Sequence, residues 1–147
     1  MEFKSILLVE DNLSDVDLAI RAFEKTGLMN PVFVVEDGKE ALDYLFCTGQ
    51  YFKRDQSDTP ALILLDLKLP MVDGLSVLKQ VRLNRLTKLV PVVILTSSNE
   101  ENDIAATYEC YVNSYLRKPV DFTEFANIIQ QLANYWLKLN ILSPKPQ

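Results

Sequence analysis

Residues 62–70 read LILLDLKLP, an apolar run that ends in a carboxylate at Asp66. An unbroken run of this kind predicts a strand buried on both faces of a parallel sheet. A carboxylate inside such a strand would be costly. A carboxylate at its carboxyl end lies instead where open α/β sheets bind ligands. Asp66 is therefore the first candidate site residue of the chain.

Strand and helix signals alternate along the rest of the sequence, which predicts a doubly wound α/β fold with a five-stranded parallel sheet. The expected strands are Ser5–Val9, Val32–Val35, Leu62–Leu65, Val92–Leu95 and Ser114–Leu116. The expected helices are Ser14–Lys25, Gly38–Cys47, Leu75–Leu83, Asn99–Tyr108 and Phe122–Leu139. Residues 49–60, GQYFKRDQSDTP, show no periodicity and predict a long polar loop.

Polar side chains also follow three other predicted strands: Glu10 and Asp11 the first, Thr96 the fourth and Lys118 the fifth. Taken singly, each has an ordinary structural interpretation as a turn, cap or surface residue. Strand ends of a parallel sheet share one edge, so together these residues predict a site.

The chemistry of this set suits a divalent cation and a phosphoryl group. Asp11 and Asp66 can supply two carboxylate oxygens to Mg²⁺, with Glu10 acting through water. Lys118 can neutralise a phosphoryl oxygen as a point charge, and Thr96 can donate a hydrogen bond to another. Phosphoryl transfer depends mostly on positioning and electrostatics, so few groups suffice.

Composition narrows the class of protein. The chain has 147 residues, a net charge of −5, no histidine and two cysteines without metal-like spacing. We expect one domain over residues 1–147, with a core over about 4–139, a tail over 140–147 and no output domain. Without a basic block, an 18-residue apolar stretch or a signal-peptide layout, we expect a cytoplasmic protein that binds neither nucleic acid nor membranes.

The chain resembles the receiver domain of two-component response regulators, the chemotaxis-regulator-like fold. The motifs that carry this resemblance are Glu10-Asp11, DLKLPMVDG from Asp66, LTSS from Leu95 and YLRKP from Tyr115. Each motif alone is weak, but together, in order and spacing, they are specific and cover nearly the whole chain. The resemblance implies a flavodoxin-like parallel sheet with strand order 2-1-3-4-5.

The resemblance also implies roles for individual residues. Asp66 would accept a phosphoryl group from a sensor histidine kinase, and Mg²⁺ would be bound by Asp11, Asp66 and the backbone carbonyl of Lys68. Lys118 would contact the phosphoryl group. Thr96 and Tyr115 would form a conformational switch, in which the Tyr115 ring fills space that the Thr96 hydroxyl leaves. The protein would thus be a signalling phosphoacceptor rather than an enzyme.

Three stretches, residues 45–70, 108–116 and 134–144, look like the single-domain regulators that serve phytochrome kinases in cyanobacteria. Members of this kind are thought to act as dimers. The chain departs from many receivers at Tyr111-Val112, where Gly-Ala is common before the fifth strand. A bulky residue there puts the usual left-handed turn in doubt.

Two alternatives stay open beside the receiver interpretation. A docking pseudo-receiver would not be phosphorylated, although Asp11, Asp66, Thr96 and Lys118 are all present. An aspartyl-nucleophile phosphatase would resemble D-x-D motifs, in which the second Asp acts as acid and base, but that position is Lys68.

The last predicted helix carries more apolar residues than one sheet face requires. Apolar residues at helical spacing are Phe125, Ile128, Ile129, Leu132 and Trp136, and others on further sides or beyond are Tyr135, Leu137, Leu139, Ile141 and Leu142. Such a surplus predicts an interface, and two-fold pairing into a homodimer is the commonest solution. The alternative is that the tail folds back over its own domain.

Overall fold

The computed structural model describes residues 3–144 and alternates strands with helices. The strands are β1 (Ile6–Val9), β2 (Val32–Val35), β3 (Leu62–Leu65), β4 (Val92–Thr96) and β5 (Ser114–Arg117). The helices are α1 (Leu13–Lys25), α2 (Gly38–Phe46), α3 (Gly74–Leu83), α4 (Glu101–Glu109) and α5 (Phe122–Asn134), with short turns η1 (Gly49–Tyr51) and η2 (Tyr135–Leu139). Every predicted strand and helix is present, with ends displaced by a few residues.

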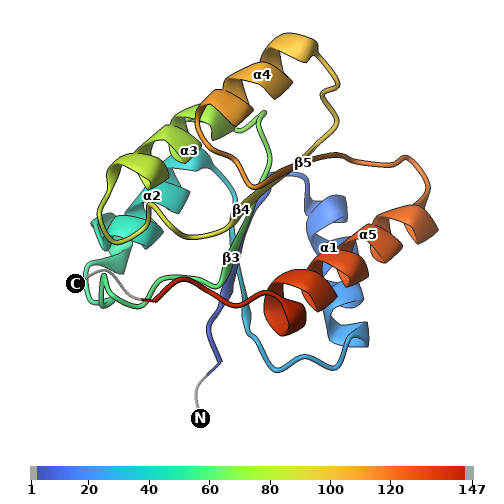
Figure 1. The fold of residues 1–147 in the computed structure, drawn as a ribbon, viewed down its shortest axis with the longest axis horizontal. Helices are drawn as coiled ribbons and strands as arrows, with labels where there is room; N and C mark the ends of the chain where they lie inside the picture. Colours follow the sequence, from blue (N-terminus) through green and yellow to red (C-terminus); the bar gives the residue numbers. More distant parts are fainter. Residues whose placement is uncertain (1–2, 145–147) are drawn as a thin grey trace.

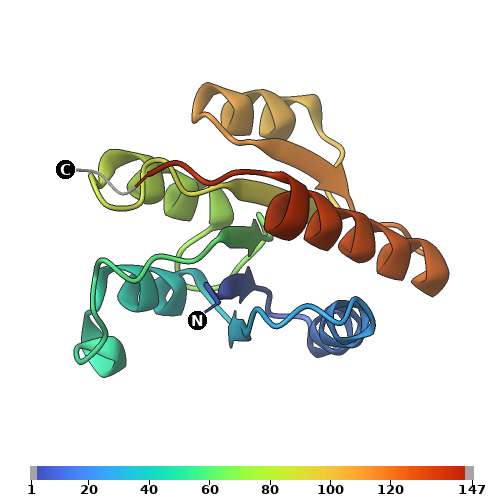
Figure 2. The same ribbon diagram turned by 60° about the horizontal axis from the view of Figure 1, so that its bottom comes forward.

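The five strands form one parallel sheet in the order β2-β1-β3-β4-β5, which confirms the predicted topology. Helices α1 and α5 pack together against one face of the sheet, and α2, α3 and α4 lie on the other side (Figure 1). The turned view in Figure 2 shows the same layered arrangement. None of the helices in residues 3–144 is both long and apolar enough to cross a membrane.

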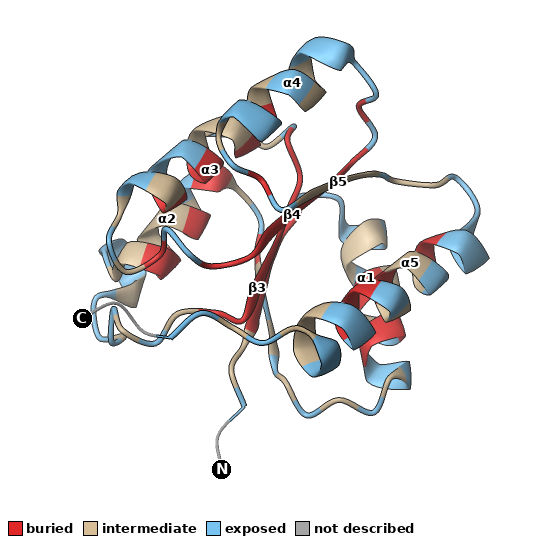
Figure 3. Cartoon of the chain, in the orientation of Figure 1, coloured by how far each residue is buried: buried red, intermediate tan, exposed pale blue. Residues whose placement is uncertain are grey.

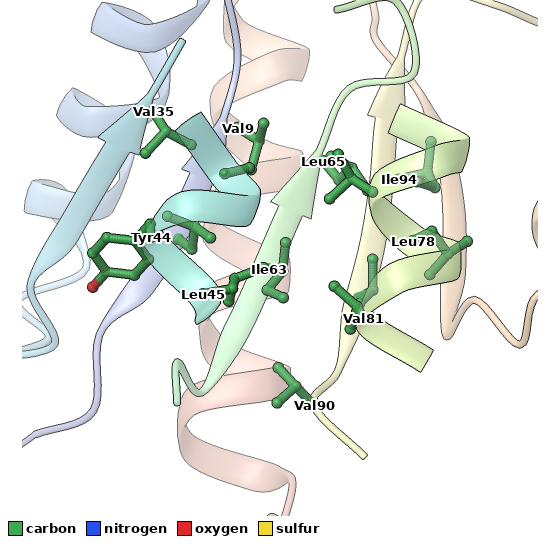
Figure 4. Packing of buried hydrophobic residues seen from close by; sticks show 14 of the residues in the cluster. Val9, Val35, Tyr44, Leu45, Ile63, Leu65, Leu78, Val81, Val90 and Ile94 are labelled. Carbon is green, nitrogen blue, oxygen red and sulfur yellow. The ribbon is translucent and has the colours of Figure 1, made fainter. Parts of the chain in front are cut away.

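Alternate residues of the central strands enter two separate hydrophobic cores, as the two-residue period of a strand requires. In β3, Ile63 and Leu65 pack with α2 and α3, whereas Leu62 and Leu64 pack with α1 and α5. Figure 3 shows that buried residues run along the central strands, and Figure 4 shows the core under α2 and α3. β3 is fully buried on both faces, as its apolar run predicted.

Four of the five α-helices begin with an acidic or amide side chain that caps free backbone N–H groups. These N-cap residues are Asn12, Asp37, Asp73 and Asp121. Each cap satisfies donors that a helix start leaves unpaired and typically contributes about 1 kcal/mol. The N-cap of α4, Glu100, makes no such side-chain bond.

The turn before β5 keeps its left-handed conformation although its residue is a tyrosine. Tyr111 has φ 60°, so the doubt raised by its bulk was wrong. Its side chain is exposed, and the side-chain Nε–H of Arg82 donates to its carbonyl oxygen at 3.0 Å. Arg82 also donates to Val90 O and Asn113 Oδ1, so its side chain joins the end of α3 to the segments that precede β4 and β5. These bonds hold a backbone conformation that costs an L-residue about 1–2 kcal/mol.

The predicted long polar loop at residues 49–60 is present and contains the short turn η1. Arg54 anchors this loop, because its guanidinium group stacks on the Tyr44 ring at 3.8 Å and donates to Asp58 O at 2.7 Å. The last helix was predicted to run unbroken to Leu139, but it is α-helical only to Asn134 and ends in the π-helical turn η2.

The described part of the tail, residues 140–144, folds back over its own domain and crosses the amino end of the sheet (Figure 1). Leu142 and Pro144 line a cavity of about 90 Å³ together with Lys4 and Pro91, which precede β1 and β4. The rest of the predicted tail lies outside the described residues. Ile141 stays fully on the surface, at 92% exposure.

Candidate functional site

Backbone hydrogen bonds place the site residues at the carboxyl edge independently of their side-chain contacts. The Glu10 N–H donates to Val35 O at 3.0 Å and the Asp66 N–H to Val9 O at 3.1 Å. On the β4–β5 side of the sheet, the Lys118 N–H donates to the Thr96 carbonyl oxygen at 2.7 Å. Parallel pairing therefore continues one residue beyond β1, β3 and β5, and it holds the carboxyl edge rigidly.

The Lys118 ammonium group lies at this carboxyl edge, as the sequence predicted, and contacts three carboxylates. Its Nζ is 2.5 Å from Glu10 Oε1, 2.8 Å from Asp66 Oδ2 and 2.9 Å from Asp15 Oδ2. An ammonium group has three N–H donors and no acceptor, so three carboxylates occupy it completely. Burial by itself lowers the pKa of Lys118, but these hydrogen bonds outweigh burial and hold the pKa above its ordinary value.

Asp66 is buried and both of its oxygens are engaged. Oδ2 accepts from Lys118, whereas Oδ1 accepts from the Thr96 hydroxyl at 2.7 Å and from the Lys68 N–H at 3.2 Å. Burial by itself raises the pKa of Asp66, but the hydrogen bonds from Lys118 and Thr96 outweigh it and hold the pKa below its ordinary value. The carboxylate therefore stays ionised at neutral pH, which a nucleophile requires.

Three carboxylates at this edge can share a cation. One oxygen each of Glu10, Asp11 and Asp66 lie within 4.8 Å of one another. Hard oxygen donors of this kind suit Mg²⁺, and the exposed Asp11 leaves room for the waters that Mg²⁺ retains. Burial, together with the negative charge of Asp66, raises the pKa of Glu10 to about 7 despite its bond to Lys118. A bound divalent cation would offset this crowding of negative charge. The Lys68 carbonyl stays a predicted ligand.

The DLKLPMVDG motif brings the start of α3 against the end of β3, where Asp66 lies. Gly74 donates its N–H to Leu67 O at 2.9 Å, and an added Cβ would overlap the carbonyl oxygen of Asp66. Only glycine fits this close approach. Asp73 caps α3 through the Ser76 N–H at 2.9 Å, so the glycine and the cap fix the loop beside Asp66.

Tyr115 lies beside the loop that follows Thr96. The half-buried Tyr115 donates its hydroxyl proton to Ser98 O at 2.9 Å. The Ser98 hydroxyl in turn donates to Asp103 Oδ2 at 2.6 Å, in the first turn of α4. The predicted switch pair is thus connected through the β4–α4 loop.

Sequence reasoning placed Glu10, Asp11, Asp66, Thr96 and Lys118 at one edge, where the structure has them, but it gave no role to three other residues of the network. These are Asp15, Ser98 and Asp103. The only local signal for Asp15 is its place in the first turn of α1, three residues after the N-cap. Its contact with a residue 103 positions later has no local signature.

A parallel sheet that gathers an acid pair, a buried aspartate, a threonine and a lysine at its carboxyl edge has the arrangement that the resemblance to a receiver domain implied. Residues 6–130 match the response regulator receiver domain, and the chain belongs to this family.

Two curated relatives are similar over most of their length. The chain is 40% identical to the probable methanogenesis regulatory protein FilR2 of Methanothrix harundinacea, over 96% of this chain and 88% of the relative. It is 37% identical to the response regulator Rcp1 of a Synechocystis species, over 92% of this chain and 90% of the relative.

Solved structures agree with the fold. The Mn²⁺-bound form of Rcp1 is similar with a TM-score of 0.89 and 35% identity, covering 96% of this chain and 99% of the other. The phosphorylated cyanobacterial phytochrome response regulator RcpA is similar with a TM-score of 0.91 and 36% identity, covering 97% and 100%.

Proposed function

We propose that this receiver domain accepts a phosphoryl group on Asp66 from a sensor histidine kinase, in a Mg²⁺-dependent reaction. The observation that carries the proposal is the arrangement of Lys118 and Thr96 on the two oxygens of one buried, ionised Asp66. Both donors already lie where the charge of an incoming phosphoryl group would develop. That Rcp1 has a Mn²⁺-bound form and RcpA a phosphorylated form supports the proposal.

The reaction needs little covalent chemistry from the protein. An oxygen of Asp66 attacks phosphorus, the bond from phosphorus to the donor breaks, and the donor leaves with that bonding electron pair. Lys118 neutralises a phosphoryl oxygen without losing its bond to Glu10, and Thr96 shifts its hydroxyl hydrogen bond from Asp66 to a phosphoryl oxygen. Bound Mg²⁺, held by Asp11 and Asp66, would neutralise further charge.

The rim of the site suits a protein partner. Four large apolar side chains at the carboxyl edge are at least 68% exposed: Leu13, Met71, Val120 and Phe122. Apolar residues gathered around a reactive group typically mark an interface. We propose a kinase of the phytochrome type, because Rcp1 and RcpA are similar over nearly their whole length and RcpA is described as a phytochrome response regulator. The net charge of −5 argues against direct contact with nucleic acid.

We propose that the signal leaves the site through Thr96 and Tyr115. Movement of the Thr96 hydroxyl toward a phosphoryl group shifts the β4–α4 loop, which includes Ser98. The Tyr115 hydroxyl is bonded to the Ser98 carbonyl and follows that movement, with its ring turned inward. The proposed path is short, because Thr96 ends β4 and Ser98 lies two residues later in the β4–α4 loop.

We further propose a homodimer formed by the end of α5 and η2. The structure assigns Phe125, Ile129 and Leu132 to the core, so these three are not available for an interface. Other apolar residues remain at least half exposed: Tyr135, Leu139 and Ile141. Tyr135 lines a groove between β5 and α5 together with Leu116, Ile128 and Trp136, and Leu139 and Ile141 follow in the chain. A second copy of the chain would cover this face with two-fold symmetry.

Analytical ultracentrifugation tests the dimer. A concentration-independent mass near 16.8 kDa would exclude it. Truncation after Lys138 removes Leu139 and Ile141 but keeps Tyr135. Loss of the dimer in that variant would place the interface on the tail, and its persistence would place the interface on α5.

Labelling with a small acyl phosphate and Mg²⁺ tests the proposed function. We expect the wild-type protein to become phosphorylated, and Asp66→Asn to remain folded without label, because a neutral amide of the same shape is a poor nucleophile. Label retained in Asp66→Asn would disprove the assignment of this residue. A pseudo-receiver would bind no label in either form, and a phosphatase would hydrolyse the donor over many turnovers.

A further inference from the structure

The acidic side chain of Asp15 contacts the site from α1, outside the motifs that define it. Its Oδ2 is 2.9 Å from Lys118 Nζ, and this ion pair joins the first turn of α1 to the end of β5. Asp15 does not belong to the three-carboxylate cluster of Glu10, Asp11 and Asp66. Its carboxylate therefore meets the lysine and not the cation position.

The helix cap does not explain this carboxylate. The α1 cap uses the side chain of Asn12, which accepts from the backbone N–H of Asp15 at 3.1 Å. This bond fixes the Asp15 backbone and leaves its side chain to contact Lys118. The side chain is 23% exposed, so it covers the ammonium group from the solvent side while still reaching it directly.

We propose that Asp15 is a positioning residue for Lys118, holding the ammonium group in place while Asp66 is phosphorylated; this inference rests on the proposed function. A lysine side chain has four flexible methylene groups and loses rotamer entropy when it is held in one geometry. An ion pair present before the reaction pre-organises the lysine, so less ordering is required in the transition state.

The three partners of Lys118 change differently during the reaction. The Asp66 oxygen that forms the new bond to phosphorus loses most of its negative charge, so that partner weakens. Glu10 is shared between the lysine and the cation cluster. Of these three acids, only Asp15 has no partner role besides Lys118. Its bond to the ammonium group therefore persists before and after phosphoryl transfer. It is therefore the steadiest anchor of the ammonium group.

The first test compares Asp15→Asn with Asp17→Asn. Both remove one negative charge from α1, but Asp17 pairs with Arg21 on the surface at 3.1 Å and makes no ion pair with Lys118. With acetyl phosphate at saturating Mg²⁺, we expect Asp15→Asn to slow labelling about five- to tenfold, the effect of one partly exposed charge-assisted hydrogen bond. Asp17→Asn should change the rate less than about twofold. An unchanged or faster Asp15→Asn rate would overturn the proposal.

A double-mutant cycle shows whether Asp15 acts through the lysine. In a Lys118→Met background, we expect Asp15→Asn to cause no further loss of labelling rate. The same five- to tenfold loss in both backgrounds would mean that Asp15 acts through general electrostatics or helix stability, and would overturn the proposal.

A spectroscopic measurement separates this inference from the proposed function. The ¹H–¹⁵N signal of the Lys118 ammonium group reports its hydrogen exchange without any phosphoryl donor. We expect exchange about fivefold faster in Asp15→Asn and unchanged in Asp17→Asn, because a neutral amide in place of one of three carboxylates binds the ammonium group more weakly. Unchanged exchange in Asp15→Asn overturns the inference whether or not Asp66 is phosphorylated. Absence of label on the wild-type protein, with faster exchange in Asp15→Asn, overturns only the proposed function.

Discussion

Helices α5 and α4 lie on opposite sides of the same sheet and are anchored very differently. Asp121 caps α5 through two backbone N–H groups, and Phe125, Ile129, Leu132 and Ala133 are buried beneath it. The start of α4 has no side-chain cap, and Thr107 is its only buried residue in the described chain. β5, next to α4 at the edge of the sheet, is nowhere fully buried.

This difference would place the proposed chemistry on the firmly anchored part of the domain and the proposed switch beside α4. Asp66 and Glu10 follow the buried central strands β3 and β1, so their carboxylates are held by a rigid base. The Tyr115 and Ser98 contact lies beside the weakly anchored α4. Segments that move in regulated proteins are usually those with low local stability. Helix α4, with no side-chain cap and one buried residue, has this property.

The largest expected effect on stability comes from shortening one isoleucine in each helix to alanine. Ile129→Ala in α5 should lower the free energy of unfolding by about 3–4 kcal/mol, because it leaves a cavity in a fully buried site. Ile104→Ala in α4 should cost only about 1 kcal/mol, because that side chain is half-buried. Urea unfolding of both variants measures the difference. Equal losses would remove the contrast between the helices.

Hydrogen exchange sharpens the comparison without mutation. We expect the amides of α4 to exchange about thirtyfold faster than those of α5, because a helix with no cap bond and one buried residue opens locally. Exchange followed by mass spectrometry measures both helices in one sample. Acetyl phosphate with Mg²⁺ should slow exchange in α4 more than in α5, and the reverse order would contradict the proposed switch.

The site at the ends of β1 and β3 should make the stability of the protein depend on pH. Burial raises the pKa of Glu10 from its ordinary 4.5 to about 7, so the folded state binds more protons than the unfolded chain between these values. Stability without Mg²⁺ should therefore fall as pH rises from about 4.5 to 7, lowering the Tm by a few degrees. The depressed pKa of Asp66 acts in the opposite sense, below pH 3.8, outside this window.

Melting curves in EDTA measure this slope, and Glu10→Gln is the control. Glu10→Gln cannot ionise and should flatten the slope between pH 5 and 7. Millimolar Mg²⁺ should raise the Tm at pH 7, because an ion held by the carboxylate cluster would bind the folded state only. An unchanged Tm with Mg²⁺ would mean that these acids do not act as a cation site.

The smallest effect concerns strain at the end of α4. Tyr111 has φ 60° and an exposed side chain, so Tyr111→Gly should relieve strain and raise stability by about 0.5 kcal/mol. The matched change Tyr108→Gly lies within the helix and should lower stability by about 1 kcal/mol. Thermal unfolding of both variants measures the opposite signs. A loss of stability in Tyr111→Gly would mean that the tyrosine side chain itself supports the turn.

Local patterns in the sequence determined the strands and the five residues at the carboxyl edge. The strand order came from the resemblance to the receiver family. This succeeded because a buried parallel strand must be apolar along its length, so a polar residue such as Asp66 marks where burial ends. The parallel topology then brings Glu10, Thr96 and Lys118 to the same edge.

Only the tertiary structure decided which other side chains complete the site. Asp15 meets Lys118 because α1 and α5 pack together on one face of the sheet, which brings residues 103 positions apart into contact. The left-handed turn at Tyr111 depends likewise on Arg82, which donates to its carbonyl oxygen from another helix. A sequence pattern reports the direction in which a side chain points from its own element. Contacts between elements depend on how the whole core packs, and no local pattern records that packing.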